Sequence, residues 1–268
     1  MNTRWICSIL LTGLLLLCII PAVQADESTN LTNEAILLIH GGSTNYARAI
    51  ALIDEAFAIN SSAFGNRLEG LELKSYAQIQ LGNYTGAAAT IDQALAIEES
   101  AVLWNNKGYI LYLQNDYADA VDAYTRALTI NPAYTVALIN RGNAMMELKN
   151  YPGAVDSYTK ALASDKDVNA LTLPVQEKTW NNLGEAYYSL GNYTASAAAY
   201  QSALKIDPTN TTATAGLARA SQQTQPWTFL TIAALAAVIV IVCTVIALVI
   251  RKRKPAAPEK KRSRKSRK

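Results

Sequence analysis

Two stretches of the chain carry the same residues at the same offsets, and this repetition restricts the fold more than any other feature. The first runs from residue 104 to 132 and the second from 180 to 208. Small residues at Gly108 and Ala120 would let two antiparallel helices approach closely, Tyr124 would fill the space beside them, and Pro132 would end the second helix. The positions Trp104, Gly108, Leu111, Tyr117, Ala120, Tyr124, Ala127 and Pro132 recur as Trp180, Gly184, Tyr187, Tyr193, Ser196, Tyr200, Ala203 and Pro208. The pattern therefore predicts helical hairpins that stack to bury their apolar faces, with the tryptophans and tyrosines buried between helices.

Weaker copies extend the pattern in both directions. Leu138 begins a copy 34 residues after Trp104, Leu71 begins one 33 residues before it, and residues 30–63 match only the second half. We therefore expect an all-α solenoid over residues 30–224, with repeats at about 30–63 (degenerate), 68–100, 101–134, 135–168 and 177–210 and a capping helix at 211–224. The spacing from Leu138 to Trp180 is 42 residues, so we expect a loop around Val168–Gln176.

The repeats resemble the tetratricopeptide repeat family, in which first helices line a concave groove that binds proteins. The resemblance implies that Asn106, Asn140 and Asn182, each two residues after the Trp or Leu marker, face the groove as a ladder. A carboxamide both donates and accepts hydrogen bonds, so such a ladder could read a peptide backbone without demanding a sequence. The alternative is that asparagine is simply the family's usual residue there. Further groove residues are expected to be Tyr109, Asn143, Lys178 and Asn105.

The carboxylate clamp of some family members is not expected, because only Asn140 and Lys178 match its pattern of Lys, Asn, Asn, Lys and Arg.

Both ends of the chain have membrane-related patterns. Residues 1–25 resemble a secretory signal, with Arg4 followed by the apolar run Ile6–Ile20 and a small-residue cleavage site at Ala25. Residues 227–250 carry no charge, and at about 1.5 Å per residue they are long enough for a hydrocarbon core of about 30 Å. This segment is expected to form one transmembrane helix.

Charge is distributed unevenly along the chain. Residues 251–268 hold eleven basic and one acidic residue, whereas residues 26–226 hold twelve basic and twenty acidic ones. The positive-inside rule then predicts a single-pass cell-membrane protein with the repeats outside the cytoplasm and the tail inside. The basic tail is expected to be disordered and attracted to anionic lipid. No nucleic-acid binding is expected, because no aromatic or folded element accompanies these charges.

The residues needed for catalysis or metal binding are sparse. The chain has a single histidine, His40, and its cysteines, Cys7, Cys18 and Cys243, lie in the signal-like and membrane segments. We therefore expect no catalytic site, no metal and no cofactor, and not an enzyme. Five Asn-x-Ser/Thr sequons are candidate glycosylation sites, although asparagine is also a common turn residue. They are Asn30, Asn60, Asn83, Asn192 and Asn210.

These patterns favour a non-enzymatic scaffold that is anchored in the membrane and binds a protein or peptide outside the cytoplasm, as in envelope or archaeal surface proteins carrying such repeats. Two alternatives stay open. One is an accessory subunit of a membrane enzyme or of a glycan or envelope assembly complex. The other is a tail-anchored cytoplasmic adaptor, which would require the basic tail to cross the membrane.

Overall fold

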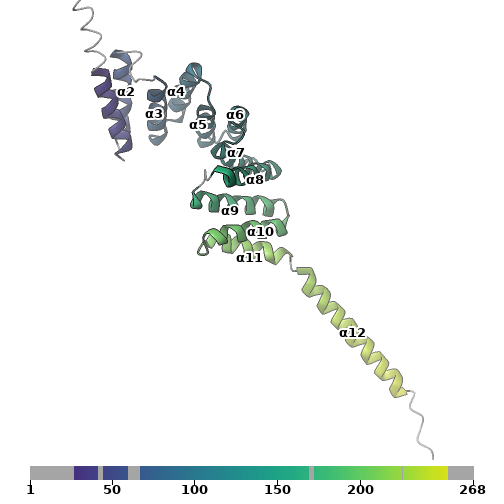
Figure 1. Cartoon of the computed structure of the whole chain (residues 1–268). Helices are drawn as coiled ribbons and strands as arrows, with labels where there is room; N and C mark the ends of the chain where they lie inside the picture. The colour runs from purple at the N-terminus through teal and green to yellow at the C-terminus, as the bar shows by residue number, and fades with distance from the viewer. Residues whose placement is uncertain (1–26, 42–44, 60–66, 169–171, 225, 253–268) are drawn as a thin grey trace, which may run out of the picture.

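The computed structural model describes residues 27–41, 45–59, 67–168, 172–224 and 226–252, and every regular element in these ranges is an α-helix (Figure 1). A helix over residues 27–40 comes before α2. The helices that follow are α2 (Tyr46–Ile59), α3 (Arg67–Gln80), α4 (Tyr84–Ile97), α5 (Ala101–Leu113), α6 (Tyr117–Ile130), α7 (Thr135–Glu147), α8 (Tyr151–Val168), α9 (Leu173–Ser189), α10 (Tyr193–Ile206), α11 (Thr211–Thr224) and α12 (Pro226–Lys252). The expected all-α solenoid is confirmed.

Helices α3 to α10 form four hairpins, α3–α4, α5–α6, α7–α8 and α9–α10, which stack side by side (Figure 1). Each helix packs on the helix before it and the helix after it. In addition, α5, α7, α9 and α11 each contact the next odd-numbered helix, whereas no comparable contact joins successive even-numbered helices in the described residues. The odd-numbered helices therefore lie on the more crowded side of the stack. We call the surface of α3, α5, α7 and α9 on this side the inner face, and the surface of the even-numbered helices the outer face.

Each hairpin turn contains one residue with a positive φ. These residues are Gly82 (73°), Asn115 (64°), Lys149 (57°) and Gly191 (76°). The next N–H then returns five positions to the first helix, as Asn83 N–H does to the Gln78 carbonyl at 2.9 Å. This is the pattern of a Schellman helix end. Asn83, Asn150 and Asn192 then cap the second helix through their Oδ1 atoms. The turn residues thus set the antiparallel direction of each pair.

A glycine on the first helix faces a tyrosine on the second in three hairpins. The pairs are Gly108–Tyr124, Gly142–Tyr158 and Gly184–Tyr200. Each of these tyrosines is only 1% exposed. A Cβ atom added at Gly142 would lie 2.5 Å from Tyr158 Cε1, well inside ordinary contact distance. Glycine is therefore required for the ring to lie flat between the two helices.

The tryptophans are less buried than we expected. Trp104 and Trp180 are both half-buried, so the expectation of tryptophans enclosed between helices is wrong. Trp104 packs against the core cluster that contains Leu128. Its indole also lies under two cations, with Lys107 Nζ 5.4 Å and Arg126 Cζ 4.8 Å from the ring centroid. The ring is therefore covered partly by polar side chains rather than by core.

The expected loop around Val168–Gln176 is also largely wrong. Helix α8 continues to Val168 and α9 begins at Leu173, so the extra residues lengthen both helices to 18 and 17 residues. Pro174 lies in the first turn of α9. A proline is favourable there, because its missing N–H would have no partner inside the helix anyway.

Two helices complete the chain at its C-terminal side. Helix α11 covers the last hairpin with Ala213, Gly216 and Ala220, and a Cβ at Gly216 would collide with the Tyr200 ring. Helix α12 then extends away from the stack (Figure 1). Its residues 232–249 have a mean hydropathy of 3.2 and none is buried, and α12 is the one described helix long and apolar enough to cross a membrane. Residues 1–25 and 253–268, where a signal and a basic tail are predicted, lie outside the described residues.

Candidate functional site

The inner face carries large side chains that are exposed to solvent. Tyr76 on α3, Val102 and Tyr109 on α5, and Val136 on α7 are 46%, 46%, 43% and 46% exposed. They lie on three successive odd-numbered helices, so they form one row along the stack. A row of this kind is suited to contact a partner chain that crosses the repeats.

Asparagines join neighbouring repeats across the inner face. Asn140 Nδ2 on α7 donates to Asn105 Oδ1 on α5 at 3.0 Å. Asn182 Nδ2 on α9 donates to Asn143 Oδ1 on α7 at 3.1 Å. The Asn143 oxygen also accepts a hydrogen bond from the Tyr158 hydroxyl at 2.7 Å, which ties the pair to the core. Two amide pairs therefore hold α5, α7 and α9 in register.

The geometry differs from a single file of three asparagines. Asn140 and Asn182 belong to different pairs, and each is paired with a residue that we had placed beside the ladder. Asn106 lines a separate cavity near Tyr109, and its Oδ1 lies 3.4 Å from Asn105 Nδ2. The carbonyl oxygens of Asn140 and Asn182 have no hydrogen-bond partner in the described part of the chain. These two oxygens remain available as acceptors.

A polar cavity of about 290 Å³ lies at the C-terminal end of the inner face. Lys178 is exposed at its rim and forms no ion pair within the described residues. Glu185 accepts hydrogen bonds from the Tyr200 hydroxyl at 2.8 Å and from Arg219 at 2.6 Å. Burial, and then the Glu147 carboxylate, raise the pKa of Tyr112. The lining residues are Tyr112, Asn143, Met146, Glu147, Tyr158, Lys178, Asn182 and Glu185.

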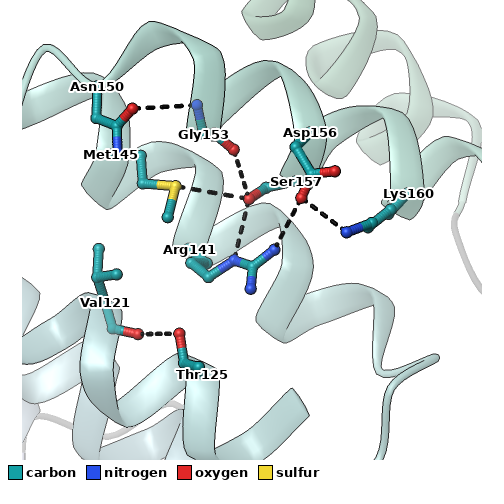
Figure 2. A network of polar contacts seen from close by, with 9 residues as sticks. All are labelled: Val121, Thr125, Arg141, Met145, Asn150, Gly153, Asp156, Ser157 and Lys160. Atoms are coloured by element: carbon teal, nitrogen blue, oxygen red, sulfur yellow. Dashed lines mark hydrogen bonds and ion pairs between the residues drawn. The ribbon is translucent and has the colours of Figure 1, made fainter. Parts of the chain in front are cut away.

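The outer face is held together by cations in three of the repeats. Lys74, Lys107 and Arg141 each follow the Trp or Leu marker by three residues and pair with Asp54, Asp92 and Asp156. Figure 2 shows the third of these, in which the Arg141 guanidinium lies between Ser157 and Asp156, with Nε 3.0 Å from Ser157 Oγ. Asp156 also pairs with Lys160 at 2.8 Å.

The fourth repeat breaks this series. Leu183 occupies the position of the cation, and an apolar cavity of about 430 Å³ lies there between α8 and α10. Trp180, Leu183 and Leu162 line it together with several alanines. This cavity is larger than the polar one, but its walls offer few groups that could orient a ligand.

The five sequons lie in different settings. Asn60 lies outside the described residues, and Asn30 is exposed in the helix over residues 27–40. Asn83 and Asn192 are exposed helix caps. Asn210 is half-buried, with its Nδ2 against Glu177. Access for a modifying enzyme is therefore better at Asn83 and Asn192 than at Asn210.

No group of three His, Cys, Asp or Glu side chains that could hold a metal ion occurs among the described residues. The site is thus defined by amides, tyrosines and single charges.

Sequence reasoning missed several inner-face residues. Val102 and Val136 follow the apolar pattern of their helices, so they were read as part of the core. Glu147 and Glu185 lie at the same face as Asn143 and Asn182, and their spacing along the repeats could have placed them there. Tyr112 could have been found in the same way.

The tetratricopeptide repeat family matches residues 101–134 and 177–210. Small glutamine-rich tetratricopeptide repeat-containing protein 2 of Mycosarcoma maydis is 31% identical over 108 residues, which are 40% of this chain and 28% of that protein. Dynein axonemal assembly factor 4 of Rattus norvegicus is 34% identical over 121 residues, or 42% of this chain and 27% of that protein. The heat-shock protein cognate co-chaperone sgt12 of Aspergillus fumigatus is 28% identical over 102 residues, or 38% and 28%. The chain thus spans less than a third of each of these relatives.

Solved structures with the same fold include the repeat protein YrrB, described as having an unusual peptide-binding site. Its TM-score is 0.54 at 21% identity, covering 68% of this chain and 88% of that one. A repeat protein from Parabacteroides merdae has a TM-score of 0.61 at 16% identity, covering 74% of each chain. At these identities the likeness shows the fold alone.

Proposed function

We propose, from the premise that this chain is a tetratricopeptide repeat protein, that its inner face binds an extended segment of a partner protein. The observation that carries the proposal is the pair of inter-repeat amide bridges. Each bridge leaves one carboxamide oxygen, on Asn140 or Asn182, free to accept a backbone N–H from the partner. Proteins built of these repeats are typically scaffolds rather than enzymes, and we assign no catalysis to this one.

The bridges also lower the cost of binding. A carboxamide that is already held by a neighbour loses little side-chain freedom when it accepts a further hydrogen bond. The exposed row of Tyr76, Val102, Tyr109 and Val136 then supplies apolar contact beside the polar groups. Backbone acceptors combined with apolar contact suit a segment whose sequence is only loosely specified.

The proposed location is the cell membrane, with the repeats outside the cytoplasm. Three features support it: the apolar and unburied helix α12, the signal-like residues 1–25, and the basic residues 251–268. The tail-anchored cytoplasmic adaptor is the second candidate, and the relative named as a co-chaperone favours it.

Protease treatment of intact cells separates the two locations. If the repeats lie outside, added protease digests them and leaves a fragment that contains α12. If they lie inside, they survive until the membrane is opened. Survival of the repeats in intact cells, with digestion after lysis, would refute the extracytoplasmic location.

The binding role is tested with Asn140→Ala combined with Asn182→Ala in the full chain. A partner is first captured by crosslinking in intact membranes and then titrated against each variant. Loss of two neutral hydrogen bonds, each contributing about 0.5–1.5 kcal/mol, should weaken binding by about tenfold or more. Gln201→Ala with Gln222→Ala is the matched control, because both carboxamides are exposed outside the inner face. Equal affinity of the Asn variant and the control would contradict the proposal.

A further inference from the structure

A second cavity on the inner face, of about 210 Å³, lies between α3 and α5. It is separate from the polar cavity at α7 and α9. Its lining includes Glu72, Tyr76, Asn106 and Tyr109, with Ile79 and Ile91 as apolar contributors. The two tyrosines are 46% and 43% exposed, so their rings are open to a ligand. The cavity therefore combines one carboxylate with two accessible aromatic side chains.

The charge of this cavity is not neutralised. Glu72 is partly buried, and its pKa is raised by burial and then by the neighbouring carboxylates of Glu69 and Glu98. None of these three carboxylates has an ion pair within the described part of the chain. Lys74, on the same helix, pairs with Asp54 on α2. The contrast with Glu185, which Arg219 neutralises in the other cavity, is direct.

We propose that this cavity binds a lysine or arginine side chain of the segment that lies in the inner groove. The proposal rests on the proposed function, because it specifies part of the same bound segment. A cation beside Glu72 would relieve the repulsion among the three carboxylates. Tyrosine faces attract a cation through the ring quadrupole, and Asn106 Oδ1 can accept one of its N–H groups. The apolar wall would contact the methylene stem of the same side chain.

A bound metal ion fits this cavity less well. Calcium takes roughly six to eight oxygen ligands, whereas the cavity has one carboxylate, one carboxamide and two phenols at its surface. One long side chain with a charged head matches both the apolar wall and the single carboxylate.

The test is a selection of binders from an immobilised library of short random peptides by the full chain in lipid nanodiscs. The wild-type chain should enrich peptides with Lys or Arg at one position. Glu72→Gln should reduce that preference by about tenfold, because a hydrogen bond to a charged group is among the stronger ones. Asp122→Asn is the matched control, because it removes one carboxylate from an exposed position on α6. This control should keep the wild-type preference.

A misfolded variant is distinguished by its melting temperature. Glu72→Gln removes repulsion from Glu69 and Glu98, so the variant should melt at the wild-type temperature or above it. Preference lost at unchanged melting temperature supports the cationic subsite. Enrichment of peptides with no basic position, or an unchanged preference in Glu72→Gln, overturns it and leaves the proposed function standing. Enrichment of no peptide at all by the wild-type chain overturns both.

Discussion

Replacing Gly142 with alanine sets two physical effects against each other, and the structure determines the sign of the result. Gly142 lies inside α7, where alanine is favoured over glycine by about 1 kcal/mol. On helix propensity alone, Gly142→Ala should therefore stabilise the protein. The packing of α7 against α8 predicts the opposite.

The magnitude follows from the distances around the added methyl group. Its carbon would lie 2.5 Å from Tyr158 Cε1 and 2.8 Å from Cδ1. Ordinary carbon contacts are about 3.5–4.0 Å, so the ring would have to move by about 1 Å. The ring is 1% exposed, and its hydroxyl donates to Asn143 Oδ1 at 2.7 Å, so it has little freedom to move. Overpacking of about 1–3 kcal/mol and a strained hydrogen bond of about 1 kcal/mol outweigh the gain in propensity. We expect a net loss of about 2 kcal/mol.

The assay is equilibrium unfolding of the full chain in urea, in detergent micelles, followed by far-ultraviolet circular dichroism. The control is Gly153→Ala, whose added carbon would meet the flexible Met145 side chain. That change should alter stability by less than about 0.5 kcal/mol. Tyr158→Leu added to Gly142→Ala should cost less than the sum of the two single changes, because the smaller side chain leaves room for the methyl group. A Gly142→Ala protein as stable as wild type would refute the packing argument.

Three further expectations concern the core and its charges. Tyr124→Ala should cost about 3–5 kcal/mol in the same urea assay, and Trp104→Ala less, because only the tyrosine is fully enclosed; equal costs would contradict this. Burial raises the pKa of Tyr124 and Tyr158, so the stability that their neutral hydroxyls provide is complete below about pH 10 and lost as the pH rises through the folded-state values; an unfolding midpoint that stays constant above that pH would argue against it. Burial and two carboxylates raise the pKa of Glu72, so the stability linked to its protonated form is lost as the pH rises through its folded-state pKa; Glu72→Gln should therefore raise the urea midpoint at neutral pH and do so less near pH 4, and a lower midpoint at neutral pH would contradict this.

The repeat architecture could be predicted from sequence because its determinants are local. Gly108 with Tyr124, and Gly184 with Tyr200, recur at fixed spacing, and such a pair fits only where two helices nearly touch. Pro174 misled the same reasoning, because a proline can end a helix or begin one. Spacing alone does not decide between the two, whereas the structure places it in the first turn of α9.

The candidate site was harder to predict, because it depends on how one repeat is rotated against the next. Asn140 and Asn182 were identified as inner-face residues from their offsets. Their partners, Asn105 and Asn143, are set by the packing of α5, α7 and α9, which no spacing within one repeat encodes. Glu72 was not singled out at all, because a glutamate in a surface helix is ordinary until its neighbours are known.

The junction between α11 and α12 limits which partners a membrane-anchored form of this protein could meet. Helix α11 ends at Thr224 and α12 begins at Pro226, so a single residue separates the repeats from the apolar helix. With no flexible linker, the repeats stay next to the bilayer surface rather than exploring the volume above it. Encounter with a partner in the same membrane then becomes a two-dimensional search at a high effective concentration, and even a weak groove is occupied. The same geometry sorts partners by height, since a binding segment presented far above the lipid surface lies beyond the reach of the stack.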